Sequence, residues 1–134
     1  MKNYLDFFGR VLISILFLLN GYFKIINYDG TLEWMESYNV PGIFLTPAII
    51  IEITAPILII IGYKTKLAAA ILAFFCLSTA FIFHTDFSNQ MQVTSFLKNV
   101  GLAGGFLFIV VNGSKKFSID NKNKKWKKLK LIEL

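Results

Sequence analysis

Residues 43–62 read IFLTPAIIIEITAPILIIIG, a run in which Glu52 is the single charged residue. A helix needs about 20 predominantly apolar residues to cross the hydrocarbon core of a membrane. This run has that length and is apolar around the whole helix, whereas a helix of a soluble bundle has one apolar stripe. The sequence therefore favours a membrane-spanning helix here over a helix of a soluble bundle.

Three further apolar stretches of similar length accompany this run. They cover residues 7–26, 67–83 and 94–111. The chain of 134 residues is 55% hydrophobic and 16% charged, whereas a soluble domain is about 25% charged. The first stretch lacks the small-residue cleavage site of a signal peptide, so we expect it to be retained. We predict an all-α fold, an integral membrane bundle of four transmembrane helices.

The distribution of lysine and arginine predicts the orientation of this bundle. These residues flank the spans on one side at Lys2, Arg10, Lys64 and Lys66. A further eight of the fourteen follow Gly113. Because cytoplasmic loops carry the excess of positive charge, we expect both termini in the cytoplasm. On the opposite side, the residues around Trp34 in the loop 27–42 predict a short interfacial helix.

The chain divides into residues 1–113, the membrane bundle, and residues 114–134, a lysine-rich cytoplasmic tail. Each lysine near an anionic lipid surface contributes about 1 kcal/mol to binding. We therefore expect the tail to lie on the anionic inner leaflet. Nucleic-acid binding is the alternative for a basic run, but we do not expect it for a run that directly follows a membrane span. The sequence also allows a homo-oligomer.

Glu52 is the least expected side chain of the spans, because a charge at the centre of a span costs about 2.5–3.5 kcal/mol. Pro56 follows four residues later and lacks the N–H that would bond the carbonyl of Glu52. The side-chain carboxyl group of Glu52 and its unbonded backbone carbonyl thus lie at the same depth in the span. The pair predicts the polar centre of the bundle, and a kink with a structurally paired glutamate is the alternative.

Four residues of the first span recur on one side of the helix. They are Arg10, Ser14, Gly21 and Lys24. Helical periodicity predicts that this stripe faces the bundle. Both cations lie near span ends, from which long side chains also reach the headgroups. We favour such snorkelling for Arg10, and for Lys24 both interpretations stay open.

The third span places small residues on one face, with His84 at its end. The small residues are Ala69, Ala73, Cys76 and Ala80. Cys76 is predicted to be a packing residue, because a thiol in apolar surroundings stays protonated. One cysteine and one histidine make a metal site unexpected. His84 is either a capping side chain or the group that exchanges protons near neutral pH.

The fourth span contains a G-x-x-x-G pair, Gly101 and Gly105, on the face that it shares with Lys98. Small residues at this spacing let two helices approach closely. We predict that this face packs against another helix and carries Lys98 and Asn99 toward the centre of the bundle.

The predicted topology places a group of polar side chains in the outer half of the membrane, beneath the loop around Trp34. They are Lys24, Glu52, His84, Lys98 and Asn99. With a rise of 1.5 Å per residue, they fall within reach of one small ligand. The alternative is a set of structural ion pairs of Glu52 with Lys98 or Lys24.

Several short motifs follow one another along the chain. The chain carries Asn20-Gly21 and Lys24, Glu52 and Pro56, Phe83-His84, Phe96-Leu97-Lys98-Asn99 and Phe117-Ser118-Ile119-Asp120. In this order and spacing they resemble the DoxX family of small four-helix membrane proteins, over residues 5–120. The resemblance implies a protein of the bacterial inner membrane whose relatives include subunits of membrane oxidoreductases. The resemblance also implies that Lys24, Glu52, His84, Lys98 and Asn99 are the positions at which to test for function.

The first function that we predict is a redox-associated membrane subunit that binds a quinone, or a small sulfur or thiol species. Lys24, Lys98 and Asn99 would bind the substrate, while Glu52 and His84 would carry protons as catalytic groups. The sequence has no haem ligand pair, CxxC motif or flavin fingerprint. We therefore expect no covalently bound cofactor, and electrons would come from an oxidoreductase partner subunit.

Two other classes stay open. In the first, the chain is a non-catalytic anchor or assembly protein for a partner complex. In the second, which we rank last, it transports a small solute or protons. In every class we assign structural roles to one set of residues. This set contains Arg10, Gly21, Pro56, Gly101 and Gly105.

Overall fold

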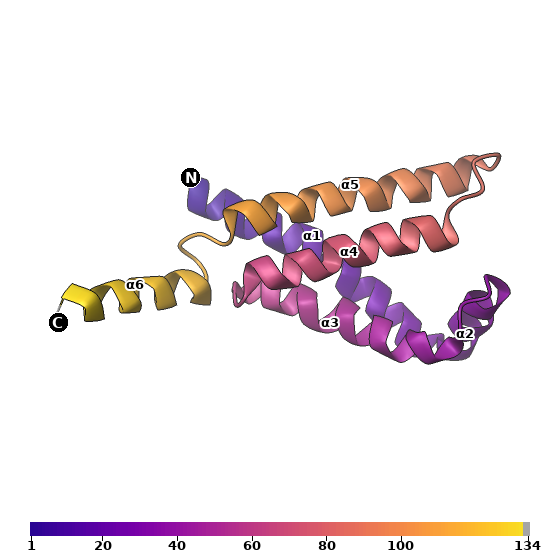
Figure 1. Ribbon diagram of the computed structural model, residues 1–134, viewed down its shortest axis with the longest axis horizontal. Coiled ribbons are helices and arrows are strands. Elements are labelled where there is room, and N and C mark those ends of the chain that lie inside the picture. Colours follow the sequence, from indigo (N-terminus) through magenta and orange to yellow (C-terminus); the bar gives the residue numbers. More distant parts are fainter. Residues whose placement is uncertain (133–134) are drawn as a thin grey trace.

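The computed structural model describes residues 1–132, and every regular element in this part is a helix (Figure 1). In chain order the elements are α1 (Lys2–Ile26), α2 (Tyr28–Ser37), the 3-10 turn η1 (Gly42–Phe44), α3 (Leu45–Ile61), α4 (Thr65–Phe83), α5 (Gln90–Asn112) and α6 (Ile119–Ile132). The predicted all-α fold is confirmed. Helices α1 and α5 begin earlier than the apolar stretches that predicted them.

Four helical segments are long and apolar enough to cross a membrane: α1, η1 with α3, α4 and α5. Their outward surface is apolar, with Phe74 and Phe108 each 75% exposed and Phe81 64% exposed. Such large exposed aromatic side chains are unfavourable in water and favourable in lipid. The four predicted spans are confirmed, and α2 is the short helix predicted in the loop 27–42.

The N-terminus, the end of α5 with the start of α6, and the turn between α3 and α4 lie at the same end of the bundle (Figure 1). We call this the terminal end. The opposite end, which we call the loop end, holds α2 and the connection between α4 and α5. The start of α1 and the end of α5 on one side agree with four crossings, while the assignment of that side to the cytoplasm stays a prediction.

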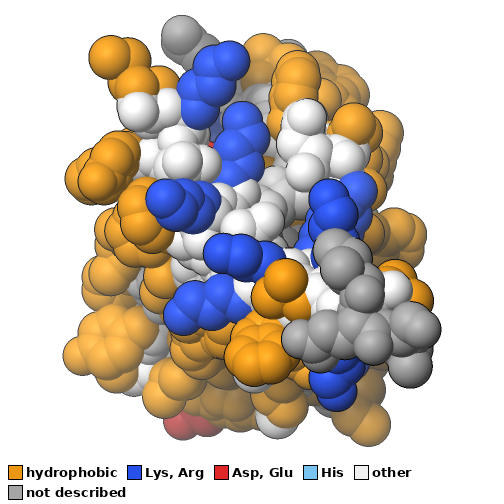
Figure 2. Space-filling model, turned by 90° about the vertical axis from the view of Figure 1, so that its left-hand side faces the viewer, with side chains coloured by type: hydrophobic (Ala, Val, Ile, Leu, Met, Phe, Trp, Pro, Cys, Tyr) orange, Lys and Arg blue, Asp and Glu red, His pale blue; other side chains and the backbone are white. Residues whose placement is uncertain are grey.

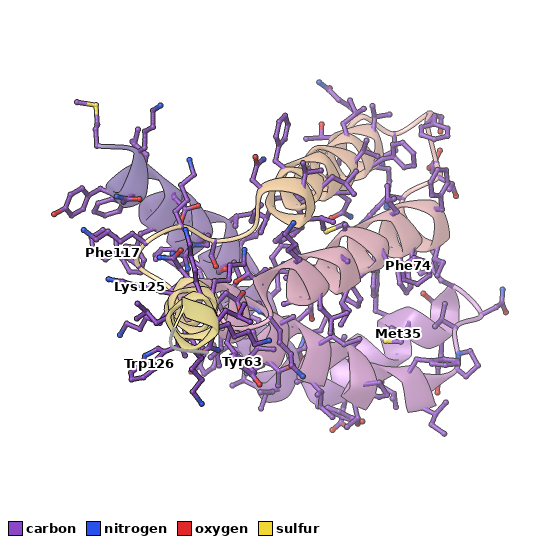
Figure 3. All side chains as sticks on the ribbon, turned by 60° about the vertical axis from the view of Figure 1, so that its left-hand side comes forward. Met35, Tyr63, Phe74, Phe117, Lys125 and Trp126 are labelled. Atoms are coloured by element: carbon purple, nitrogen blue, oxygen red, sulfur yellow. The ribbon has the colours of Figure 1, made fainter. Side chains whose placement is uncertain are left out.

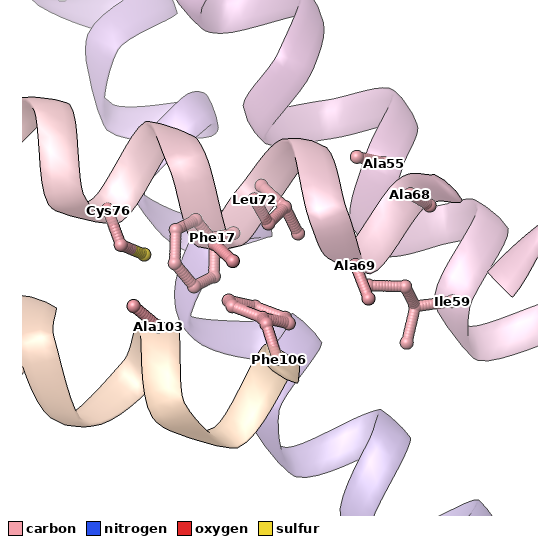
Figure 4. Close-up of a cluster of buried hydrophobic side chains, with 10 residues drawn as sticks. Phe17, Ala55, Ile59, Ala68, Ala69, Leu72, Cys76, Ala103 and Phe106 are labelled. Carbon is pink, nitrogen blue, oxygen red and sulfur yellow. The ribbon is translucent and has the colours of Figure 1, made fainter. Parts of the chain in front are cut away.

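The core is built from two helix pairs. Helix α1 packs along α3, α5 packs along α4, and α3 joins the pairs through its contact with α4. At the centre, Phe17 of α1 meets Phe106 of α5 with ring centroids 5.3 Å apart (Figure 4). The buried small residues of α4 include Ala69, Ala73, Cys76 and Ala80. This is the predicted small-residue face, and the fully buried Cys76 is a packing residue, as predicted.

Arg10 does not snorkel, and that interpretation is wrong. Its side chain is 2% exposed and lies inside the terminal end. Nη1 donates hydrogen bonds to the carbonyls of Ile59 and Ile60, both at 2.8 Å, and Nη2 donates to the carbonyl of Phe117 at 2.7 Å. Nε donates to Asp6 at 3.1 Å. The last carbonyls of a helix lack the intrahelical partners of its interior, and here that of Ile59 also accepts a hydrogen bond from the N–H of Gly62, at 3.2 Å. Arg10 therefore completes the end of α3 and ties α1 to it.

The segment that follows α5 is also fastened to the terminal end. The carboxylate of Asp120 accepts hydrogen bonds from the backbone N–H of Lys64 and from the N–H and hydroxyl of Thr65, at 2.7–2.9 Å. These groups begin α4, which has no capping side chain of its own. Burial raises the pKa of Asp120, but the hydrogen bonds from Thr65 and Lys64 outweigh this effect and lower it below its usual value.

Gly62 allows this segment to come close. It ends α3 in the left-handed region with a φ of 71°, and its carbonyl accepts a 2.8 Å hydrogen bond from the N–H of Asp120. A Cβ at this position would overlap the buried Ser118. Asp120 and Ser118 therefore connect the chain after α5 to the turn between α3 and α4.

The glycines of α5 do not form the predicted helix contact as a pair. A Cβ on Gly105 would approach Ile13 of α1 to 3.1 Å, whereas a Cβ on Gly101 would meet no atom within 4 Å. Gly101 is exposed. The prediction that both glycines pack against a helix of this chain is therefore wrong for Gly101, because the two positions differ slightly in angle around α5.

Helix α6 extends away from the terminal end along the long axis of the molecule (Figure 1). It carries Lys125 and Trp126, on the opposite side of the molecule from Met35 and Phe74 (Figure 3). Cationic side chains gather over this end (Figure 2). Because Ser118 and Asp120 fix its start, α6 projects from the bundle instead of folding across its end. Contact of the tail with anionic lipid stays a prediction.

Candidate functional site in the loop-end half

An ion pair between α1 and α3 forms the floor of the site. Lys24 Nζ lies 2.6 Å and 2.8 Å from the two carboxylate oxygens of Glu52. The side chain of Glu52 is 3% exposed and that of Lys24 is 26% exposed. Of the two ion pairs that the sequence left open, the structure contains the one with Lys24.

Close packing of α1 on α3 makes this pair possible. A Cβ on Gly21 would come within 2.7 Å of Ile53 and 3.3 Å of the Cβ of Glu52. Gly21, Ser14 and Arg10 are buried, which confirms that their stripe of α1 faces the bundle. Pro56 lies inside α3 and is buried beside this contact.

A cavity of about 550 Å³ opens above the ion pair. Its walls are mostly apolar and come from α1 to α5, with side chains such as Leu16, Ile51 and Phe75. This volume lies within the range of about 300–1,000 Å³ that is typical of small-molecule sites. The five polar residues singled out from the sequence all line it. They are Lys24, Glu52, His84, Lys98 and Asn99.

The polar groups of α4 and α5 have different surroundings. His84 ends α4, and its Nδ1 lies 2.7 Å from Oε1 of Gln92, so this nitrogen is held by a partner. Lys98 is exposed and Asn99 is half-buried. Within residues 1–132, the side chains of Lys98 and Asn99 make no hydrogen bond or ion pair. Their donors are therefore available to a ligand in the cavity.

Helix α2 covers the cavity at the loop end. Trp34 stacks on Phe83 of α4 with ring centroids 4.6 Å apart, and Tyr38 meets Phe83 edge-on at 5.4 Å. Met35 is buried against Leu45. The predicted roof around Trp34 is thus held by an aromatic cluster and by apolar packing.

Sequence reasoning missed two hydroxyl residues of the cavity wall, Ser78 and Thr79 of α4. The hydroxyl of Thr79 donates to the carbonyl of Cys76 at 3.0 Å. Two adjacent hydroxyl residues within an apolar span were the available signal, since polar side chains in spans tend to face the protein interior. The assignment of catalytic and binding roles to the five polar residues stays a prediction.

Four spans that enclose a mostly apolar cavity with a polar floor define a small multi-pass helical membrane protein. The sequence model of the DoxX family matches residues 5–85, more than half of the chain. The chain belongs to the DoxX family, as its motifs predicted.

Similar proteins place it in the inner membrane. The chain is 40% identical over 119 residues to the inner membrane protein YqjF of Escherichia coli K12, covering 88% of this chain and 92% of YqjF. It is 32% identical over 121 residues to the inner membrane protein YphA of the same strain, covering 85% and 86%. The chain is therefore a multi-pass inner-membrane protein.

A more distant likeness extends to eukaryotes. The chain is 27% identical over 128 residues to the ER-derived vesicles protein ERV29 of Saccharomyces cerevisiae, which covers 92% of this chain and 35% of ERV29. No solved structure matches the chain.

Proposed function

We propose that this protein is a redox-associated membrane subunit that binds a quinone, or a small sulfur or thiol species, in the loop-end cavity. The observation that carries the proposal is the pair of free donors, Lys98 and Asn99, in the same cavity as the buried carboxylate of Glu52. Apolar walls suit a ring or chain that arrives from the lipid, and a few placed polar groups fix its orientation.

The residues divide between binding and proton transfer. Lys98 and Asn99 donate hydrogen bonds to the oxygen atoms of the ligand, and the positive charge of Lys98 stabilises negative charge that develops there. Glu52 and His84 are the groups that take up or release the proton that accompanies each electron. A proton on Glu52 weakens its ion pair with Lys24, so proton uptake would free Lys24 to turn toward the ligand.

The protein would act as a subunit, because the sequence contains no recognisable electron carrier of its own. Electrons would pass between the ligand and an oxidoreductase partner that holds a flavin, haem or iron–sulfur group. The alternative, a non-catalytic anchor or assembly protein, is favoured by one observation. Glu52 already has a complete partner in Lys24 at 2.6 Å.

The test is to purify the protein in nanodiscs formed from native membranes and to quantify the retained quinone by mass spectrometry. Lys98→Met removes the free cation without breaking the Glu52–Lys24 pair, and Lys125→Met on α6 removes the same charge far from the cavity. We expect quinone near one per protein in the wild type and in Lys125→Met, with at least a tenfold loss in folded Lys98→Met. Quinone at the level of the bulk lipid in all three would favour the anchor role.

A further inference from the structure

We propose that a second cavity, between the start of α1 and the end of α5, binds an anionic phospholipid. We call it the terminal groove. Its volume is about 520 Å³. Its charged lining comes from Lys2, Asp6, Arg10 and Lys115, and its apolar lining includes Leu5 and Phe108. Asn112 also lines it, and its amide donates to the carbonyl of Phe108 at 2.8 Å. This groove lies at the other end of the bundle from the candidate quinone site and does not depend on that site.

The groove exists because α1 and α5 are not paired with each other. Helix α1 packs along α3 and α5 packs along α4. The two helices touch near the core, where Phe17 meets Phe106 and Ile13 meets Gly105. Toward the terminal end the two helices no longer touch, and the groove lies between them. In a membrane, lipid would reach it from the outer surface of the bundle.

The groove has room for an acyl chain. Gly9 lies on its wall, and a Cβ there would meet no atom within 4 Å. Leu5 is 65% exposed and Phe108 is 75% exposed. The part of the groove that Leu5, Gly9 and Phe108 form is apolar, and no described residue of the chain covers it. A hydrocarbon chain along this part buries no polar group.

The charges at the mouth of the groove select the headgroup. Asp6 is the one carboxylate of the lining, and its Oδ2 accepts hydrogen bonds from Arg10 Nε and from the N–H of Lys115, both at 3.1 Å. Asp6 and Arg10 are thus paired with each other. Within residues 1–132, the ammonium groups of Lys2 and Lys115 make no ion pair, which leaves two cations for one phosphate.

The position of these charges favours a lipid over a soluble anion. The two lysines lie at the end of the spans, where headgroups lie, and the apolar wall continues from them toward the core. Basic pockets between transmembrane helices bind anionic headgroups in this way. An acyl chain along Gly9 and a phosphate between Lys2 and Lys115 satisfy both halves of the groove, whereas a free phosphate satisfies only one.

The experiment titrates delipidated protein in detergent with phosphatidylglycerol or phosphatidylcholine of equal chain length and counts bound lipids by native mass spectrometry. Lys2→Met/Lys115→Met removes the two free cations, and Lys125→Met/Lys128→Met removes the same charge from α6. Gly9→Phe fills the groove without changing any charge. Circular dichroism and size-exclusion chromatography verify that each variant is folded.

We expect the wild type to bind its first phosphatidylglycerol at least tenfold more tightly than phosphatidylcholine. Lys2→Met/Lys115→Met should weaken that binding about tenfold or more, since each lysine contributes about fivefold. The α6 double variant should match the wild type. Gly9→Phe should lose the first bound lipid of either type.

Two results would overturn the proposal. One is equal weakening by the α6 double variant, which would indicate attraction to the general positive charge. The other is unchanged lipid binding in folded Gly9→Phe. If Lys2→Met/Lys115→Met does not fold, Gly9→Phe alone decides the question. None of the substituted residues lines the quinone cavity, so failure of this proposal leaves the quinone proposal untouched, and the reverse holds as well.

Discussion

The two ends of the bundle use buried charge in different ways. At the terminal end, Arg10 is 2% exposed, and its guanidinium bonds three backbone carbonyls and one carboxylate. At the loop end, Glu52 has one side-chain partner, Lys24, and both line a cavity of about 550 Å³ that Lys98 and Asn99 also line. The first set of contacts is closed, and the second is open to a ligand.

This difference separates structure from chemistry. A buried charge whose partners are backbone atoms of other helices holds those helices in place and has no capacity left for a substrate. Donors beside a cavity that have no partner among residues 1–132, such as those of Lys98 and Asn99, remain available to a ligand. We therefore expect substitution of Arg10 to act on folding, and substitution of Lys98 or Asn99 to act mainly on binding.

The largest effect is expected from Arg10→Met. The variant removes four hydrogen bonds. It takes the Arg10 donor from the carbonyls of Ile60 and Phe117 and leaves the carbonyl of Ile59 with the N–H of Gly62 alone. We expect the free energy of unfolding to fall by about 3–5 kcal/mol, as when a buried charge network loses one partner. Reversible unfolding in mixed detergent–SDS micelles, followed by circular dichroism, measures it.

Two controls support this measurement. Lys125→Met removes one charge from the exposed surface of α6 and should change stability by less than about 0.5 kcal/mol. Arg10→Lys keeps the charge but loses the planar fork that bonds several carbonyls, so it should recover only part of the loss. If Arg10→Met were as stable as Lys125→Met, the terminal end would not be the structural lock that its contacts indicate.

A smaller effect is expected from breaking the Glu52–Lys24 pair. Glu52→Gln and Lys24→Met should each lower the free energy of unfolding by about 2 kcal/mol, less than Arg10→Met because Lys24 is partly exposed. The double variant should be more stable than the sum of the single losses predicts, with a coupling energy of about 1–2 kcal/mol. The same unfolding assay completes this double-mutant cycle.

The cycle also sharpens the functional comparison. If the double variant regains stability but still lacks quinone, the pair serves the ligand as well as the fold. If it regains stability and retains quinone, the pair has a structural role only, and Lys98 and Asn99 bind the ligand without it. Losses that simply add, within about 0.5 kcal/mol, would show that Glu52 and Lys24 do not act as partners.

Helical periodicity accounts for the parts that could be predicted. It identified four spans, and it identified the stripe of α1 with Arg10, Gly21 and Lys24 as the face turned inward. The count of residues from each span end then placed Lys24, Glu52 and Lys98 in the same half of the bundle, within reach of one ligand, and all three line one cavity. Position along a span follows directly from the rise per residue.

The contacts of Arg10 could not be predicted in this way. Near the end of a span, a cation reaches the headgroups or a neighbouring carbonyl equally well. The backbone carbonyls that Arg10 bonds lie 49 to 107 residues away in the sequence. The surroundings of Gly101 could not be predicted either. The G-x-x-x-G spacing is the same whether a glycine faces another helix or, as Gly101 does here, meets no described atom of the chain. The docking of Ser118 and Asp120 depends on the turn at Gly62, which no periodicity describes.

The smallest effect is expected from Asp120→Asn, which weakens the cap of α4. At pH 7 we expect a loss of about 1 kcal/mol in the free energy of unfolding, because hydrogen bonds to a charged acceptor contribute about 1 kcal/mol more than hydrogen bonds to a neutral one. The hydrogen bonds from Lys64 and Thr65 lower the folded pKa of Asp120. The contribution of its carboxylate is therefore complete above the unfolded pKa of about 4 and is lost as the pH falls through the lower folded pKa.

Unfolding of the wild type and of Asp120→Asn, measured from pH 7 down to about pH 2.5, tests this linkage. The difference between the two should stay constant from pH 7 to about pH 5 and shrink below pH 4. Glu33→Gln is the matched control, because Glu33 is exposed in the middle of α2, away from the helix ends, and should give almost no difference at any pH. A difference that persists to the lowest pH would mean that the side-chain geometry of Asp120, and not its charge, holds the start of α4.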